Sequence, residues 1–260
     1  IEFASFYNTL GAKTTVVEVM DRILPVEDEE ISAFAKKSFV KQGMDIREKA
    51  MVKQLDRGKD TVTAHIEQNG KVETLTFDTV ISAVGIVGNT EGLGLEALGV
   101  KIDRSHVVTD EYCRTGVEGL FAIGDLAGAP WLAHKASHEG TMVAELIAGG
   151  APHPVKPESI AGCTYCSPQI ASVGLTEAKA KAAGHDVNVG RFPFIGNGKA
   201  IALGEQESRA HRPAHADIEG HLDDLCPRTH CDARGGVGRA VVEDDHPQGG
   251  MVLRQKPGQA

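Results

Sequence analysis

The run Thr-Thr-Val-Val-Glu-Val at residues 14–19 decides the fold, because Glu18 is its one residue that is not β-branched. Such a run is typical of a parallel strand that is buried on both faces of its sheet. Apolar residues at helical spacing precede the strand and end at Gly11, which is suited to a helix C-terminus. The chain is therefore expected to begin inside a helix, with the preceding strand and its glycine-rich phosphate loop missing. We expect the neighbouring position beside the strand to be an unpaired, water-exposed edge.

The segments that follow extend the same sheet. Residues 27–41 place apolar side chains on one helical face, and Gly43 lies just past the end; the apolar positions are Ile31, Ala35, Phe39 and Val40. Residues 61–66 and 72–77 flank Asn69-Gly70, a dipeptide that favours a tight hairpin turn. Residues 80–84 predict a further buried strand. This order predicts an α/β fold: an incomplete dinucleotide-binding (Rossmann-like) sheet with an antiparallel insert, over residues 1–88.

Two further units are expected. Residues 89–152 contain a short strand at 120–123, a Gly124-Asp125 turn and a helix from about Trp131 to Ile147. A linker rich in glycine and proline leads to the start of an α+β unit at residues 153–207. This third unit has expected strands at 170–173, 187–192 and 199–203, and a helix capped by Thr176.

The character of the sequence changes after residue 207. Residues 208–260 contain few large apolar residues and no aromatic residue. Burial in such a segment offsets little of the entropy lost on ordering, so we predict a divergent and disordered tail, which a frameshift would explain.

The composition excludes several classes of protein. Lys and Arg number 27 against 36 Asp and Glu, a net charge of −9, so no basic surface for nucleic acid is indicated. No apolar run approaches the roughly 18 residues of a membrane span, and no signal peptide is visible. A cytoplasmic location without membrane association is expected, and the five cysteines are expected to be reduced thiols.

Two positions of the first unit are candidates for nucleotide contacts. Glu18 lies at the end of its strand, where a carboxylate accepts both hydroxyls of an adenosine ribose, which favours NAD over NADP. The alternative is that Glu18 caps the following helix. Gly85 follows an apolar strand and would let the backbone approach a nicotinamide closely, or would only turn the chain.

The second unit offers a sharper pattern. An apolar strand that delivers Gly124-Asp125 at its carboxyl end places a carboxylate where α/β sheets bind ligands, which suits a hydroxyl of a flavin. The helix that begins near Ala133 and His134 offers free N–H groups to an anion or a polarised ring oxygen.

Other residue patterns favour structural roles. Cys163 and Cys166 have the spacing of a redox motif, but no helix follows them to lower a thiol pKa, so they are interpreted as structural thiols. His134 and His138 have the spacing of a metal pair, but no third ligand is placed, so no metal site is predicted.

From residue 1 to about 207 the chain resembles the dihydrolipoyl dehydrogenases of the pyridine nucleotide-disulfide oxidoreductase family. The resemblance is carried by six stretches: Ile1-Glu2-Phe-Ala-Ser, Thr15-Val-Val-Glu18, Ser82-Ala-Val-Gly85, Gly119-Leu-Phe-Ala-Ile-Gly-Asp125, Leu132-Ala-His-Lys-Ala-Ser-His-Glu-Gly140 and Tyr165-Cys-Ser-Pro-Gln-Ile-Ala-Ser-Val-Gly-Leu-Thr-Glu177. It implies NAD contacts at Glu2, Glu18, Val52 and Gly85, and FAD contacts at Asp125, Leu132, Ala133 and His134.

The resemblance also implies an activity and partners. A homodimeric flavoprotein of this family oxidises dihydrolipoamide with NAD, through FAD and a redox disulfide. It serves as the E3 component of 2-oxo acid dehydrogenase complexes, beside a lipoyl-bearing E2. The family's redox cysteine pair and its His-Glu base are expected to be absent from this chain, so no catalytic residue is assigned and the chain alone is expected to be inactive. Another disulfide reductase, or a non-catalytic remnant with at most weak nucleotide binding, remains the alternative.

Overall fold

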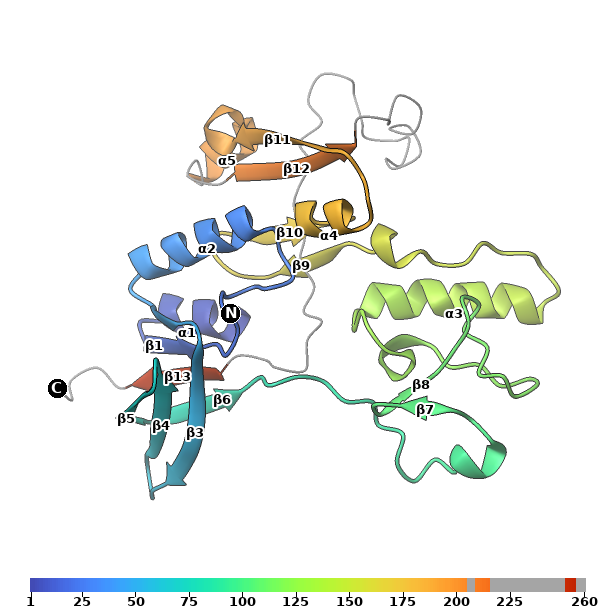
Figure 1. Ribbon diagram of the computed structural model, residues 1–260, viewed down its shortest axis with the longest axis horizontal. Coiled ribbons are helices and arrows are strands. Elements are labelled where there is room, and N and C mark those ends of the chain that lie inside the picture. The colour runs from blue at the N-terminus through green and yellow to red at the C-terminus, as the bar shows by residue number, and fades with distance from the viewer. Residues whose placement is uncertain (205–208, 216–250, 256–260) are drawn as a thin grey trace.

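The computed structural model describes residues 1–204, 209–215 and 251–255 (Figure 1). Its helices are α1 (Glu2–Thr9), α2 (Glu29–Lys41), α3 (Ala133–Ile147), α4 (Glu177–Ala182) and α5 (Gly198–Leu203), with short 3-10 turns η1 (Glu96–Leu98), η2 (Gly124–Ala127), η3 (Pro157–Ser159) and η4 (Phe194–Gly196). Its strands are β1 (Lys13–Val17), β2 (Asp45–Arg47), β3 (Ala50–Arg57), β4 (Val62–Gln68), β5 (Lys71–Phe77), β6 (Thr79–Ser82), β7 (Ile102–Asp103), β8 (His106–Val107), β9 (Gly162–Thr164), β10 (Ile170–Ser172), β11 (Val187–Pro193), β12 (Arg209–His215) and β13 (Met251–Gln255).

The first unit is built on a four-stranded sheet of order β2-β1-β13-β6. β1 and β2 are parallel, whereas β13 runs antiparallel to both β1 and β6. The expectation that β1 has an unpaired neighbouring position is therefore wrong. The same pairing corrects the prediction of a disordered tail for residues 251–255.

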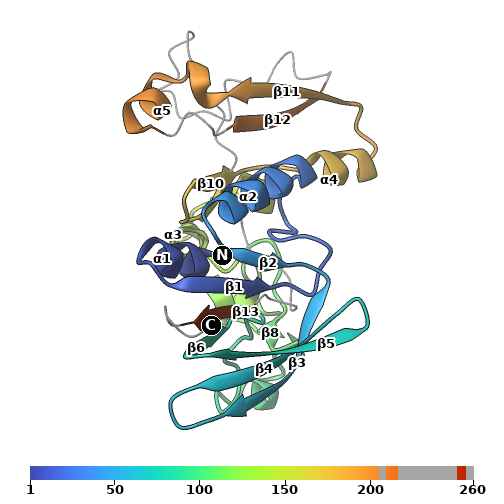
Figure 2. The same ribbon diagram turned by 90° about the vertical axis from the view of Figure 1, so that its left-hand side faces the viewer.

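Side chains of β1 alternate between two hydrophobic cores, as the pleat of a strand requires. Val16 packs with Ala35 and Phe39 of α2 on one face, and Val17 packs with residues of β3 and β4 on the other. Figure 2 shows α1 and α2 beyond one face of this sheet and β3–β5 beyond the other. Val40 does not share the buried face of α2, contrary to expectation, and is 51% exposed because it lies one residue, about 100°, past Phe39.

The antiparallel insert has three strands in the order β3-β4-β5, so the expected hairpin is confirmed and the strand β3 was missed. Asn69 and Gly70 both have positive φ and connect the paired residues Gln68 and Lys71, as in a primed two-residue turn. β6 is only half-buried and ends at Ser82, so the prediction of a buried strand at 80–84 is wrong in its burial and its end.

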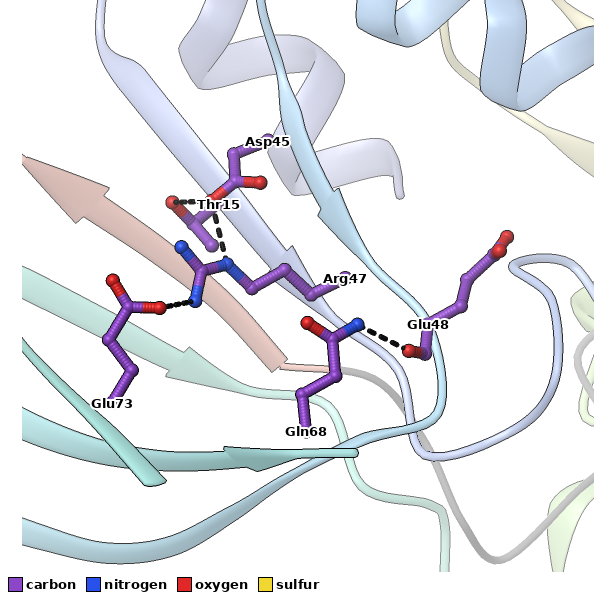
Figure 3. A network of polar contacts seen from close by, with 6 residues as sticks. All are labelled: Thr15, Asp45, Arg47, Glu48, Gln68 and Glu73. Atoms are coloured by element: carbon purple, nitrogen blue, oxygen red, sulfur yellow. Dashed lines mark hydrogen bonds and ion pairs between the residues drawn. The ribbon is translucent and has the colours of Figure 1, made fainter. Parts of the chain in front are cut away.

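A polar network connects the main sheet to the insert (Figure 3). Arg47 donates from Nε to Asp45 Oδ2 at 2.8 Å and from Nη1 to Glu73 Oε2 at 2.5 Å. The Gln68 amide donates to the carbonyl of Glu48 at 2.7 Å. These contacts fix the position of the insert relative to β2.

The second unit contains β7, β8, η2 and α3. The expected strand at 120–123 does not form, because Phe121 makes a single bridge to Arg114 and no ladder extends from it. The expected helix does form as α3, and it begins two residues later than expected.

The third unit packs against the first. Cys166 and Ile170, which lie on or beside the β9–β10 hairpin, belong to the core of α1 and α2. Ser172 donates to Glu27, and the Glu177 amide donates to Asp28 at the start of α2. The helix predicted at Thr176 is confirmed, since Thr176 Oγ1 accepts from the Lys179 amide at 3.2 Å.

The end of the third unit corrects two expectations. Residues 198–203 form α5 rather than a strand, because Asn197 Oδ1 accepts from the Ala200 amide and Gly204 ends the helix with φ 73°. Residues 209–215, expected to be disordered, form β12 and pair with β11. The rest of the predicted tail lies outside the described residues.

Candidate functional site

The turn at Gly124 is held against α3. Gly124 has φ 68°, and an added Cβ would lie 3.1 Å from the Cβ of Ala136. A side chain at this position would therefore be strained and would push the turn away from the helix. The glycine lets Asp125 lie close to the beginning of α3.

Two buried charged residues of α3 bind the turn. Lys135 Nζ donates to the carbonyls of Gly124 and Gly128, at 3.1 and 2.6 Å. Glu139 Oε2 accepts from the Gly124 amide at 2.7 Å, and Glu139 Oε1 lies 3.4 Å from Lys135 Nζ. Lys135 is 4% exposed and Glu139 is 8% exposed, so water screens these contacts little.

Asp125 and the start of α3 present groups that a polar ligand can use. The Asp125 side chain is exposed and has no hydrogen bond or ion pair within the part of the chain that the structure describes. Leu132 at the N-cap offers no side-chain cap, and the first turn of α3 holds no acidic residue. The Leu132 N–H already donates to the carbonyl of Pro130 at 3.0 Å, whereas the N–H groups of Ala133 and His134 in the first turn can donate to an anion or a carbonyl oxygen. The assignment of Leu132, Ala133 and His134 to a flavin stays a prediction.

The His134 side chain contacts the third unit. Its ring Nε2 lies 2.5 Å from the carbonyl oxygen of Ala161, a contact in which the ring nitrogen donates. The side chain is thereby directed toward the third unit, while the backbone of the same residue stays in the first turn of α3.

Glu18 and Val52 lie near each other at the end of β1. Glu18 is 7% exposed, and its Oε1 accepts from the Met20 amide at 2.8 Å. Its carbonyl oxygen accepts from the Ala50 amide, and Val17 and Val52 belong to one hydrophobic cluster. This contact lies in the turn after β1 and not at the start of α2, whose N-cap is Asp28, so it does not support the capping alternative, and the ribose assignment stays a prediction.

Glu2 and Gly85 lie on other elements. Glu2 begins α1, and its Oε1 accepts from the Tyr165 amide at 2.6 Å. Gly85 follows β6, is exposed and has φ 121°, a conformation that favours glycine. Glu2 and Gly85 thus lie on elements other than β1 and β3, which lead to Glu18 and carry Val52.

Burial disfavours ionisation of two thiols among the described residues, those of Cys113 and Cys166. Burial raises the pKa of Cys166 to about 12 and that of Cys113 to about 11. Cys163 and Cys166 are unbridged, in agreement with their interpretation as structural thiols. Among the described residues, no group of three or more His, Cys, Asp or Glu side chains could hold a metal ion.

Sequence reasoning assigned no role to Lys135 and Glu139. Their spacing contained a signal, because positions 135, 139, 142 and 143 lie on one face of α3, and the last two are the buried Met142 and Val143. A lysine and a glutamate on an apolar helix face are rarely buried unless they are paired.

No helix of the described residues is long and apolar enough to cross a membrane.

The structure thus combines a mixed sheet, in which β1 and β2 are parallel, with an antiparallel insert and a Gly-Asp turn docked on a helix. A model of the pyridine nucleotide-disulphide oxidoreductases matches residues 1–140, and a model of their dimerisation domain matches residues 160–211. The chain belongs to the pyridine nucleotide-disulphide oxidoreductase family.

Comparison with individual proteins gives a narrower match than the family models do. Dihydrolipoyl dehydrogenase of Rhizobium etli is 57% identical over 80% of this chain, and that of Zymomonas mobilis is 50% identical over 78%. The chain spans 44% of the length of each. The resemblance found in the sequence is thereby confirmed, and the chain corresponds to a part of such a protein.

Solved structures share the fold. LpdA from Mycobacterium tuberculosis superposes with a TM-score of 0.75 at 23% identity, over 97% of this chain and 49% of that chain. The flavoprotein disulfide reductase RclA from Escherichia coli gives a TM-score of 0.72 at 23% identity, over 82% of this chain and 48% of that chain. The expected fold class is confirmed.

Proposed function

We propose that this chain is part of a dihydrolipoyl dehydrogenase, which oxidises dihydrolipoamide with NAD. The observation that carries the proposal is the Gly124–Asp125 turn, which docks on α3 and whose carboxylate has no hydrogen bond or ion pair among the described residues. Relatives named dihydrolipoyl dehydrogenase, among them one that is 57% identical, support this choice within the family. FAD, when bound, would carry electrons between a dithiol and NAD.

The residues of the second unit fit a flavin. The Asp125 carboxylate accepts hydrogen bonds from hydroxyls of a ribitol chain. Backbone N–H groups at Ala133 and His134 donate to a polarised oxygen of the ring, and Leu132, whose own N–H donates to Pro130, lies beside them at the N-cap. Because Gly124 has no side chain, Asp125 stays close to α3.

The residues of the first unit fit NAD. Glu18 accepts hydrogen bonds from the hydroxyls of the adenosine ribose. Val52 contacts the adenine, and Gly85 lets the dinucleotide approach the backbone. Glu2, at the start of α1, completes the group. All four assignments rest on the family resemblance and on the α/β fold around them.

The steps that move electrons through a disulfide require residues from elsewhere in the full-length enzyme. The raised pKa values of Cys113 and Cys166 disfavour their thiolates, so neither suits thiol-disulfide exchange. The redox cysteine pair and the His-Glu base would come from other parts of the enzyme. This chain alone is therefore inactive in dihydrolipoamide oxidation.

The proposal extends to organisation and partners. Residues 1–88 form the NAD-binding domain, residues 89–152 complete the FAD site and residues 153–207 begin the dimerisation domain. The match to a dimerisation domain supports a homodimer. The partner of the enzyme is a lipoyl-bearing E2, and its location is cytoplasmic.

The test uses the full-length protein that carries this sequence. We expect it to purify with flavin and to reduce NAD with dihydrolipoamide. Asp125→Asn should lower the flavin content, whereas the control Asp103→Asn changes an exposed aspartate of the same unit and should not. A wild-type protein without flavin, or one that reduces a different disulfide substrate and leaves dihydrolipoamide unoxidised, would contradict the proposal.

A further inference from the structure

Lys135 and Glu139 stand out because they are buried charges outside the residues assigned to either cofactor. Both lie on the face of α3 that packs against η2. Burial of a charge is costly unless it is paired and hydrogen-bonded. Within the part of the chain that the structure describes, both side chains form their hydrogen bonds with the backbone of the turn at 124–128.

The bonds are distributed along the turn. Glu139 binds the amide of Gly124, and Lys135 binds the carbonyl of the same residue, so both polar groups of this glycine are held. Lys135 also binds the carbonyl of Gly128, three residues beyond Asp125. Asp125 therefore lies between two anchored points, and its own carboxylate stays exposed.

We propose that Lys135 and Glu139 are positioning residues, which hold the 124–128 turn so that the Asp125 carboxylate and the start of α3 face one polar ligand. This inference rests on the proposed function, in which that ligand is a flavin. The pair touches neither the flavin nor any reacting atom. It acts by restricting the turn before the ligand arrives, which lowers the entropy lost on binding.

The first experiment requires no flavin and uses this chain. The double variant K135M/E139L replaces both charges with apolar side chains of similar size, so that no buried charge is left unpaired. Hydrogen exchange at the Gly124 amide should become faster, because its acceptor is gone. The single variant E139Q keeps a side-chain oxygen that can accept from the Gly124 amide, so hydrogen exchange at this amide should stay slow. An unchanged rate of hydrogen exchange at the Gly124 amide in K135M/E139L would refute the proposal that the pair holds the turn.

A matched control is the pair of half-buried Glu177 and exposed Lys181, which has the same i, i+4 spacing on α4. K181M removes that ion pair and should leave exchange at Gly124 as it is in the wild type. If K181M accelerates exchange at Gly124 as much as K135M/E139L does, the effect is global loosening and the inference is wrong.

The second experiment measures the dissociation constant of FAD in the full-length protein. K135M/E139L should weaken binding about tenfold. Adding Asp125→Asn to it should cost little more, because the pair acts through Asp125. The inference would be overturned if the losses in FAD binding free energy of K135M/E139L and Asp125→Asn were fully additive, or if K135M/E139L bound FAD tightly. A wild-type protein that binds no FAD while the Gly124 amide still depends on the pair would instead contradict the proposed function.

Discussion

Glu27 is expected to make the stability of the chain depend on pH. Its side chain is 3% exposed and accepts one hydrogen bond, from Ser172 Oγ at 3.3 Å. Burial raises its pKa from 4.5 to about 8, and the neighbouring charges are Asp28, which also raises it, and Lys179, which lowers it. The folded chain therefore keeps a proton on Glu27 that the unfolded chain releases.

The sign and size of the effect follow from linkage. Between pH 4.5 and about 8 the folded state binds one more proton at Glu27 than the unfolded state does, so the free energy of unfolding falls as the pH rises. The contribution is fully present below pH 4.5 and is lost as the pH rises through about 8. At about 1.4 kcal/mol per pH unit over this window, the loss is about 5 kcal/mol. The free energy of unfolding of a whole domain is only about 5 to 15 kcal/mol.

The assay is urea unfolding of this chain at several pH values between 5 and about 9. Glu27→Gln keeps an oxygen that accepts from Ser172 but cannot ionise, so the stability of the variant relative to the wild type should rise with pH. Glu29→Gln, at an exposed position of the first turn of α2, serves as the control and should follow the wild type. Wild type and Glu27→Gln curves that stay parallel across the window would refute the reasoning.

Four further predictions concern the candidate site. Glu18→Ala in the full-length enzyme should raise the KM for NAD far more than that for dihydrolipoamide, and equal changes in steady-state kinetics would argue against a ribose contact. Asp125→Ala should release FAD, because a carboxylate beside α3 is lost, and full flavin absorbance after purification would disprove this role. This chain alone should contain no flavin and show no dihydrolipoamide:NAD activity, and stoichiometric FAD in the purified chain would contradict that. Cys166 should resist alkylation by iodoacetamide at pH 8 in the folded chain, since its pKa is about 12, and rapid labelling detected by mass spectrometry would show otherwise.

Local patterns in the sequence determined much of the first unit. The β-branched run at 14–19 predicted β1, and Asn69-Gly70 predicted the turn between β4 and β5, because both depend on preferences of adjacent residues. The Gly124-Asp125 turn and the helix after it were also visible in sequence. The same reasoning failed at α5, where the cap Asn197 and the terminal Gly204 outweigh the apolar run between them.

Contacts between distant segments were decided only by the tertiary structure. β13 lies between β1 and β6, and no local preference of residues 251–255 selects those two strands as partners. The burial of Lys135 and Glu139 depends on the turn at 124–128, whose backbone groups satisfy both charges. The proton on Glu27 likewise depends on β10 and α4 covering the start of α2, because desolvation is a property of the packed molecule and has no counterpart in the order of residues.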